Sequence, residues 1–367
     1  MNIIYITNHL NIGGITSYIL TLSKRLKLMG HNVYIASGGG ELTSKLIDNG
    51  IVYIPIPIKT KQETSPKIFI SMLKLLAPIK KYGIDIVHSN SRTTGVLGSL
   101  LQKYTRVSHI STCHGFFKKR FFRKVFPCWG QRTIAISEQV KEHLINDFKV
   151  DANKIDVIHN GIDVGRFREP RTENREQAKK KLGLDNGPVI GIVARLSDVK
   201  GHTYLIEAMH DIINEVPRAQ LLIVGDGKMR QELISLTNSL GVSKSVFFIP
   251  SVNDTRDVLS IMDVFVMPSV KEGLGLALME AMAFGLAVIG SDVGGIRSLI
   301  QDGYNGLLIN PKDAKDLSRA ILGLLKDPPK RAILGNNAKS FIGQNFSQEK
   351  MAKETERAYL ECINQKK

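Results

Sequence analysis

The chain has 367 residues, of which 43% are hydrophobic, so it has enough apolar material for two domains of ordinary size, which argues against wholesale disorder. Its three cysteines form no disulfide framework, which favours an intracellular, reducing setting. The net charge is +16, and residues 1–168 carry +14 of it, from 24 Lys and Arg against 10 Asp and Glu. The first half should attract anions, so nucleic acid, an anionic membrane face and phosphorylated substrates are all candidate partners.

The start of the chain has no charged side chain before Lys24, a pattern that resembles a secretion signal. A basic leading region is missing, however, and Asn2, Asn8 and His9 interrupt the apolar run, so we expect no signal peptide. The apolar runs also fall short of the ~18 residues that a membrane span needs. We therefore expect a cytoplasmic protein, with peripheral contact to the inner face of the cell membrane left open.

Short β-branched runs alternate with amphipathic stretches along the whole sequence. Strands are predicted at 2–7, 32–37, 51–55, 84–89, 107–112, 133–137, 155–159, 188–194, 220–225, 245–249, 263–268, 286–290 and 306–309. Nearly continuous apolar strands that alternate with helices indicate parallel sheets covered on both faces. The fold class is therefore α/β.

The polar, turn-rich segment 168–188 separates two such series and is predicted to connect two domains. Residues 1–168 and 186–345 should each form a Rossmann-like, doubly wound parallel-sheet domain. We expect the two to face a central cleft, since ligands of such sheets bind at the carboxyl ends of the strands. Residues 347–363 read as one terminal helix, and its packing back on the first domain is left open.

Two motifs follow strands of the first domain. Gly13 and Gly14 lie between the first strand and a helix, as in a phosphate-binding loop, although any tight turn has the same need. The G-x-G-x-x-G spacing is absent there, so we expect no dinucleotide site. His114 follows a later strand, where a satisfied core histidine is the alternative. Its neighbour Cys113 should point to the opposite face, which argues against a Cys–His nucleophile pair.

Three motifs follow strands of the second domain. Arg195 and Lys200 in VARLSDVKGH would suit a diphosphate, although solvated surface charges are the commoner case. A Gly-Asp-Gly turn at Gly225 resembles a nucleotide loop. In SVKEGLGLALMEAMAFG, glycines precede a helix that is predicted to begin near Leu274, and a helix start suits a phosphate.

Glu272 lies before that helix and Glu280 about two turns along it. Carboxylates accept hydrogen bonds from sugar hydroxyls, so the pair indicates a ligand with an anionic part and a polyol part, with two solvated glutamates as the alternative. The sequence contains no H-E-x-x-H, C-x-x-C or Asp-x-Asp pattern, and we expect no metal and no other cofactor.

Taken together, E-x7-E, R-x4-K, VGDG, the N-terminal glycine pair, the His-Gly after a front-half strand and IHNGID resemble the retaining glycosyltransferases of family 4, which have the GT-B fold. The resemblance covers almost the whole chain in the right order. It implies a metal-independent glycosyltransferase (a hexosyltransferase-type enzyme) that moves a sugar from a nucleoside-diphosphate sugar with retention. The departing diphosphate would accept the acceptor's proton.

The resemblance also implies roles for individual residues. Glu280 would accept from the donor ribose, and Glu272 would bind hydroxyls of the donor sugar. Arg195 and Lys200 would hold the diphosphate and act in catalysis. The other donor-binding positions would be Gly13, Gly14, Asn160, Gly225, Leu274 and Gly275. His114 would lie beside the donor sugar and the acceptor as a catalytic residue.

The stretch HGFFKKRFFRKVFPCWGQR is both aromatic and basic. Drawn as a helix, it separates its aromatic side chains from most of its basic ones, which is typical of a helix in an anionic membrane interface. A domain helix with a wet basic face is the equal alternative. Because the first domain binds the acceptor in this family, a lipid-linked or envelope glycan acceptor follows as a hypothesis. The residues assigned to membrane or acceptor contact are Phe117, Lys119, Arg120, Phe121, Arg123 and Lys124.

Two other functions remain in view. A nucleotide-sugar epimerase of the same fold would convert the donor without an acceptor. A basic nucleic-acid-binding module would explain the charge, but no helix-turn-helix, zinc or RNP-type motif supports it, so we expect no nucleic-acid partner. The donor base, the sugar, the acceptor and the oligomeric state are not determined by the sequence.

Overall fold

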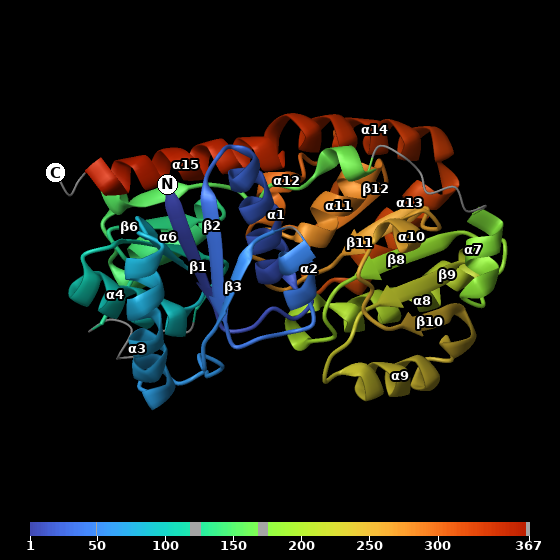
Figure 1. Ribbon diagram of the computed structural model, residues 1–367. Helices are drawn as coiled ribbons and strands as arrows, with labels where there is room; N and C mark the ends of the chain where they lie inside the picture. The colour runs from blue at the N-terminus through green and yellow to red at the C-terminus, as the bar shows by residue number, and fades with distance from the viewer. Residues whose placement is uncertain (49, 118–125, 168–174, 365–367) are drawn as a thin grey trace. The chain divides into compact units, whose positions relative to one another are not determined.

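The computed structural model describes residues 1–48, 50–117, 126–167 and 175–364 (Figure 1). Within them the chain forms two compact units, Met1–Gly161 together with Gln348 onward, and Ile162–Ser347. Every strand predicted from the sequence is present, with small shifts at its ends.

The first unit contains a seven-stranded parallel sheet in the order β3-β2-β1-β4-β5-β6-β7. Its strands are β1 Asn2–Thr7, β2 Asn32–Ser37, β3 Val52–Pro55, β4 Ile86–Ser89, β5 Ser108–Cys113, β6 Arg132–Ala135 and β7 Ile155–Val157. The helices described in this unit are α1 Gly14–Leu28, α2 Thr43–Asp48, α3 Pro66–Lys81, α4 Arg92–Thr105, α6 Glu138–Phe148 and α15 Gln348–Asn364. One core lies under α1 and α15, and another lies under α3 and α4, so both faces of the sheet are covered.

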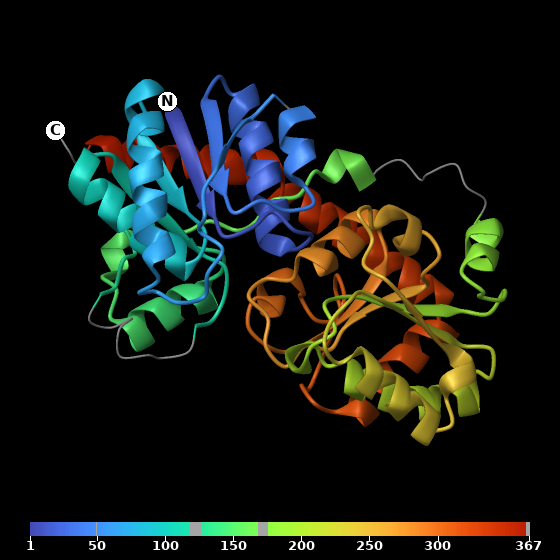
Figure 2. The same ribbon diagram turned by 60° about the horizontal axis from the view of Figure 1, so that its bottom comes forward.

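The second unit contains a six-stranded parallel sheet in the order β10-β9-β8-β11-β12-β13. Its strands are β8 Val189–Val193, β9 Gln220–Val224, β10 Val246–Ile249, β11 Val264–Met267, β12 Ala287–Ser291 and β13 Leu307–Ile309. Its α-helices are α7 Arg175–Lys181, α8 His202–Glu215, α9 Arg230–Ser239, α10 Arg256–Leu259, α11 Leu276–Phe284, α12 Ile296–Leu299, α13 Ala314–Lys326 and α14 Pro328–Asn345. They lie on both faces of the sheet (Figure 2). Strands β8, β9, β11 and β12 are almost wholly buried, which explains their continuous apolar sequences.

The boundary between the units falls at Gly161, before the predicted end of the first domain at residue 168. Ile162 belongs to the second unit because its N–H donates to Phe346 O at 3.0 Å and it bridges to Ser347. The terminal helix α15 closely matches the predicted 347–363 and packs on α1 of the first unit. An Arg25–Glu349 ion pair at 3.6 Å joins the two helices.

Candidate functional site

The loops that follow β8, β9 and β11 share one edge of the second sheet. These strands are neighbours and parallel, so their carboxyl ends lie together, where doubly wound sheets bind ligands. The three loops carry the R-x4-K, Gly-Asp-Gly and E-x7-E motifs. The topology thus brings the three motifs of the second unit to one edge.

Backbone contacts hold the loop after β8 against the loop after β11. Val270 N–H donates to Val199 O at 2.9 Å. Gly201 has a φ of +73°, and a Cβ built on it would lie 1.8 Å from Pro268 O. A glycine is therefore required there both for its left-handed backbone and for close approach of the two loops.

This contact places Lys200 beside Glu272. Lys200 Nζ lies 2.5 Å from Glu272 Oε2, and the two side chains are only 21% and 12% exposed. Ser269, which is fully buried, has its Oγ 3.4 Å from the same carboxylate oxygen. Arg195 is exposed on the loop that carries Lys200. The lysine of the R-x4-K motif is thus paired with the first glutamate of the E-x7-E motif. The spacing of the motifs in the sequence did not predict this pairing.

Helix α11 begins at Leu276, two residues after the predicted start near Leu274, because Gly275 has a φ of +99° and cannot be part of the helix. Leu274 itself is buried. A Cβ on Gly275 would lie 3.2 Å from Met267 Sδ, so the glycine also fits the turn tightly against β11.

Glu280 is partly buried on α11. Thr255 Oγ1 donates to its Oε2 at 2.9 Å. Burial raises the pKa of Glu280 to about 7, since the charged form loses hydration that one hydroxyl only partly replaces. Near neutral pH this carboxyl is thus divided between its neutral and ionised forms, and added hydroxyl donors would favour ionisation.

The Gly-Asp-Gly turn packs against the loop that carries Arg195. A Cβ on Gly225, whose φ is +150°, would lie 2.1 Å from Ala194 O, and one on Gly227 would lie 2.1 Å from Leu196 O. Asp226 accepts from Ser251 N–H at 2.8 Å, which ties the turn to the segment after β10. These glycines therefore allow close packing of the two loops, a role that does not depend on nucleotide binding.

His114 of the first unit is held by two neighbours at the carboxyl end of β5. Its Nε2 lies 3.1 Å from Asn90 Oδ1, and the Tyr18 ring meets its ring edge-on at 4.8 Å between centroids. Burial lowers the pKa of His114 to about 3, so the imidazole is neutral at physiological pH. Burial raises the pKa of the Cys113 thiol to about 12, so this cysteine is no thiolate nucleophile at neutral pH.

The other first-unit candidates differ in exposure. Gly13 and Gly14 are exposed at the start of α1, and a Cβ on either would meet nothing within 4 Å. No neighbouring atom therefore excludes a side chain at either position, although the φ of +158° at Gly13 itself favours glycine. Asn160 is buried, and its Oδ1 has no hydrogen-bond partner in the structure, which marks it as a polar group available to a ligand or water.

Sequence reasoning missed His202, which follows Lys200 and Gly201 directly. Its side chain is 2% exposed, and neither ring nitrogen has a hydrogen-bond partner. Burial, with a smaller contribution from Lys200, lowers its pKa to about 4. Its position directly after the basic motif, in the sequence KGH, could have identified it as a candidate site residue. The sequence did not show that the side chain is buried.

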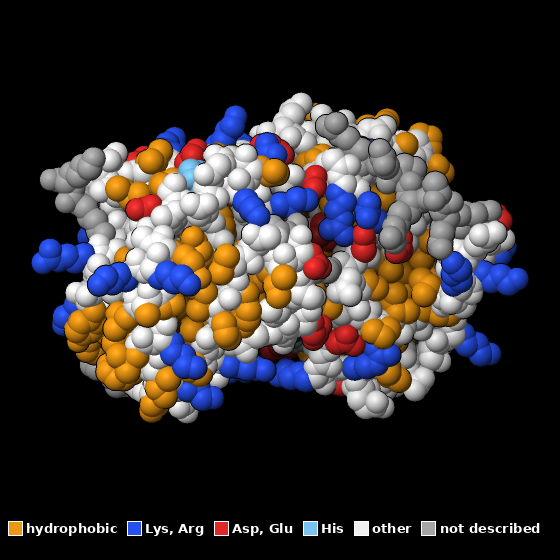
Figure 3. All heavy atoms as spheres, viewed as in Figure 1, with side chains coloured by type: hydrophobic (Ala, Val, Ile, Leu, Met, Phe, Trp, Pro, Cys, Tyr) orange, Lys and Arg blue, Asp and Glu red, His pale blue; other side chains and the backbone are white. Residues whose placement is uncertain are grey.

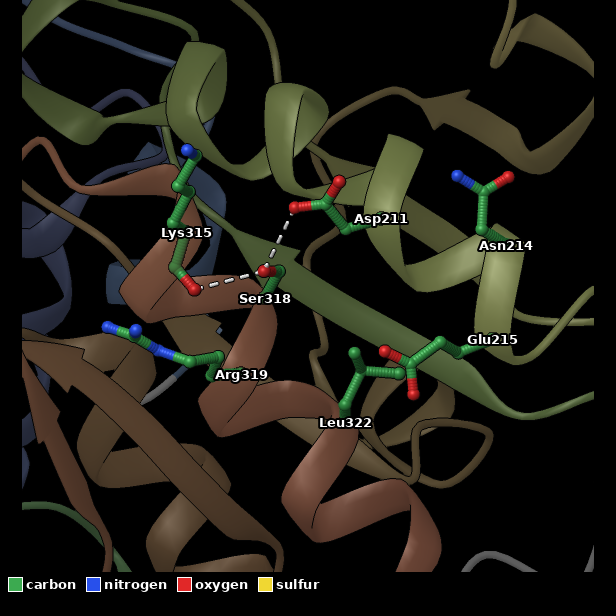
Figure 4. Close-up of a pocket in the computed structure, with 7 residues that line it drawn as sticks. All are labelled: Asp211, Asn214, Glu215, Lys315, Ser318, Arg319 and Leu322. Carbon is green, nitrogen blue, oxygen red and sulfur yellow. Dashed lines mark hydrogen bonds between the residues drawn. The ribbon is translucent and has the colours of Figure 1, made fainter.

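A separate pocket of about 380 Å³ lies between α8 and α13 (Figure 4). Its lining residues are Asp211, Asn214, Glu215, Lys315, Ser318, Arg319 and Leu322. Ser318 Oγ donates to Lys315 O at 3.0 Å and lies 3.4 Å from Asp211 Oδ2. Glu215 and Arg319 instead pair with residues outside the lining, Lys326 and Asp316 respectively. The pocket lies toward the end of α8 that is far from Lys200 and contains none of the predicted site residues.

Five of the six residues assigned to membrane or acceptor contact, Lys119, Arg120, Phe121, Arg123 and Lys124, lie outside the described residues, and so does most of the predicted amphipathic helix. Phe117 is described and is partly buried, with its ring 6.1 Å from that of Trp129. Trp129 itself is buried and belongs to the packing of the unit. Among the described residues, no helix is long and apolar enough to span a bilayer, and no three His, Cys, Asp or Glu side chains converge as a metal site would require.

Two family models match the chain, one to each half. Residues 12–166 match "Glycosyltransferase Family 4", and residues 174–341 match "Glycosyl transferases group 1". An uncharacterized glycosyltransferase of Methanocaldococcus jannaschii is 30% identical over 95% of this chain and 94% of its own length. An Escherichia coli enzyme, UDP-Gal:alpha-D-GlcNAc-diphosphoundecaprenol alpha-1,3-galactosyltransferase, is 30% identical over 90% of this chain and 88% of its own length.

Solved structures share the fold. A glycosyltransferase from Rickettsia africae superposes with a TM-score of 0.85 at 25% identity, covering 99% of this chain and 98% of its own. Anabaena HepE, solved with UDP and glucose, superposes with a TM-score of 0.87 at 21% identity, covering 97% of this chain and 98% of its own. Both sheets and their connections thus match one known two-sheet architecture.

Proposed function

The chain belongs to glycosyltransferase family 4, has the GT-B fold and transfers a sugar from a nucleotide sugar, and from this we propose that it is a retaining, metal-independent hexosyltransferase acting on a lipid-linked or envelope glycan. The observation that best supports the donor site is the contact between Lys200 Nζ and Glu272 Oε2 at 2.5 Å. It places the cation that is proposed to hold the diphosphate beside the carboxylate that is proposed to bind the sugar hydroxyls, at one edge of the second sheet.

Lys200 and Glu272 are only partly exposed, so each charge loses part of its hydration, and their mutual attraction offsets that loss. When the donor binds, its diphosphate takes the place of Glu272 beside Lys200, and the freed carboxylate accepts from the sugar hydroxyls. Arg195 adds a second, exposed cation on the same loop, and backbone N–H groups near Leu274 and Gly275 complete the diphosphate site.

Glu280 would accept from the ribose hydroxyls, and the base would lie near Gly225. Two ribose hydroxyls would add to the hydrogen bond from Thr255 and would favour the ionised carboxylate. Asn160, whose buried Oδ1 is unpaired, and the exposed pair Gly13 and Gly14 are the first-unit groups proposed to contact the donor.

In the proposed reaction the bond from the sugar C1 to the diphosphate oxygen breaks. A bond from C1 to the acceptor oxygen forms on the same face, and the acceptor proton passes to the departing diphosphate. Negative charge grows on that leaving group, so Lys200 and Arg195 stabilise the transition state more than the ground state. Neutral His114 positions the reacting groups by hydrogen bonding and takes no proton.

The acceptor class rests on two supports. The E. coli relative at 30% identity is named for an acceptor that is a diphosphoundecaprenol-linked sugar. Residues 1–168 carry a net charge of +14, which suits a diphosphate-bearing acceptor or an anionic membrane face. A place at the membrane surface follows from such an acceptor.

A thermal-shift panel of nucleoside diphosphates and nucleotide sugars, with magnesium replaced by a chelator, tests donor binding. Stabilisation by a nucleoside diphosphate is expected without metal.

An assay of donor conversion then separates the two enzyme functions. Conversion of the donor only when an acceptor is added would support transfer, whereas conversion of the donor alone would favour the epimerase. A strict requirement for a divalent ion would contradict the metal-independent part of the proposal.

A further inference from the structure

Helix α3 of the first unit has an apolar row on each side. Ile68, Met72, Leu75 and Ile79 are buried in the core beneath the helix. On the outer side Phe69 is 55%, Ile70 46% and Leu73 51% exposed. An outward row of large apolar side chains is unusual on a domain helix, whose outer face is normally polar.

A row of lysines borders this outer apolar row. Lys67, Lys74 and Lys81 are all exposed and follow one another at intervals of seven residues. Seven residues advance a helix by about 20° less than two full turns, so the three ammonium groups lie along one line. No Asp or Glu occurs in Pro66–Lys81. Figure 3 shows hydrophobic side chains gathered over α3, with basic ones around them.

The charges of this face indicate what covers it. Contact with a second copy of the same helix would bring two lysine rows together, and their like charges would repel. Contact with water alone would leave the apolar row exposed to solvent, which is unfavourable. An anionic bilayer satisfies both rows, because phosphates accept from the lysines while Phe69, Ile70 and Leu73 enter the boundary of the acyl chains. The same combination is typical of helices that lie in the plane of a membrane interface.

We propose that the first unit docks on an anionic lipid bilayer through the outer face of α3, with the apolar row inserted and the lysine row against lipid phosphates. This surface deepens the proposed function, since it would keep the enzyme beside a lipid-linked acceptor. Only that role of the surface rests on the proposed function, because the docking itself is inferred from the residues of α3. It is distinct from the basic aromatic stretch that was assigned to membrane or acceptor contact from the sequence. Helix α3 was not identified from the sequence as a membrane-contacting helix.

Flotation of the full chain with vesicles tests the docking. Phosphatidylcholine vesicles with phosphatidylglycerol should bind the protein, and binding should weaken as salt rises, whereas pure phosphatidylcholine should bind it weakly. Lys67→Glu/Lys74→Glu/Lys81→Glu should lose at least ~tenfold in affinity for the anionic vesicles. Phe69→Ser/Ile70→Ser/Leu73→Ser should lose binding even at low salt, where the attraction of the lysine row to lipid phosphates is least screened.

A control with the same charge change separates this surface from net charge. Lys244→Glu/Lys315→Glu/Lys330→Glu alters three exposed lysines of the second unit and should float like the parent protein. Equal binding of the α3 variants and the parent would overturn the proposal. So would loss of binding only when Lys119, Arg120, Arg123 and Lys124 are changed to Glu. Thermal shifts with nucleoside diphosphates should stay unchanged in the α3 variants, so failure of the docking and failure of the donor site are told apart.

Discussion

Lys200 and Glu272 are 72 positions apart in the chain, yet Lys200 Nζ donates to Glu272 Oε2 at 2.5 Å. The pairing exists because Gly201 lets the loop after β8 lie against Pro268 at the end of β11. The two charges that are proposed to contact the donor are therefore paired with one another.

We predict that Lys200→Ala lowers kcat/KM by roughly a hundredfold or more, because it removes a cation that faces growing charge on the leaving group. Glu272→Ala should chiefly lower kcat, since the carboxylate is proposed to grip the reacting sugar. Steady-state kinetics with varied donor would measure both. The matched control Lys244→Ala alters an exposed lysine of the same unit and should behave as the parent. Near-parental rates for both site variants would contradict the assignment.

Glu280 should make stability depend on pH. Its pKa is raised to about 7, so the folded protein binds a proton that the unfolded chain releases near pH 4.5. Stability therefore falls as pH rises through that window, by an amount on the order of 3 kcal/mol. Glu280→Gln lacks this penalty. The melting temperature of Glu280→Gln relative to the parent should thus rise from pH 5 to pH 8, and a constant difference would refute the shift.

The same carboxyl should couple donor binding to pH. Ionised Glu280 accepts from hydroxyls better than the neutral acid, so the parent's affinity for the nucleoside diphosphate that stabilises it most in the thermal-shift panel should increase between pH 6 and pH 8. Glu280→Gln should bind that nucleotide more weakly at pH 8 and lack this increase. Comparing the two proteins in the same buffers by calorimetry cancels the titration of the nucleotide itself. Parallel pH profiles would mean that Glu280 does not face the ligand.

Gly201 and Gly241 form a matched pair for the loop contact. Their φ angles are +73° and +70°, but a Cβ on Gly201 would lie 1.8 Å from Pro268 O, whereas one on Gly241 would meet nothing within 4 Å. Gly241→Ala should cost only about 1–2 kcal/mol from its left-handed backbone. Gly201→Ala should cost more and should also weaken nucleoside-diphosphate binding, because the loop that carries Lys200 must move. Thermal melts and nucleotide titrations would measure both effects, and equal losses of stability in the two variants would show that the clash is relieved elsewhere.

The Tyr359 hydroxyl of α15 joins two buried groups of the first sheet. It lies 2.7 Å from Tyr5 Oη and 2.6 Å from His88 Nδ1. Tyr359→Phe leaves the imidazole nitrogen unpaired in a site without water access, so we expect a loss of about 1–3 kcal/mol of stability. Tyr104→Phe, at a side chain that is 62% exposed, is the control and should change little. Chemical denaturation would measure both, and an unchanged midpoint for Tyr359→Phe would show that the bond is not needed.

Much of the fold was predictable because its signals are local. Most strands of the two parallel sheets contain a short apolar run bounded by turn residues, and each strand was identified in its place, including β5, whose sequence SHISTC is mostly polar. Helix starts were less certain, as at α11, where the left-handed Gly275 delays the helix to Leu276. A single residue's φ depends on the contacts around it, and a propensity pattern does not contain those contacts.

The sequence by itself thus determined the α/β architecture, the order of the motifs and the family, since these depend on local pattern and on spacing along the chain. Only the tertiary structure decided which charges meet, which carboxyl is half-buried and which apolar residues lie outside the core. Phe69 and Ile68 look equally apolar in sequence, yet one is 55% exposed and the other 3%. Burial and contact arise from segments distant in sequence, and they set the pKa of Glu280 and the pairing of Lys200 with Glu272.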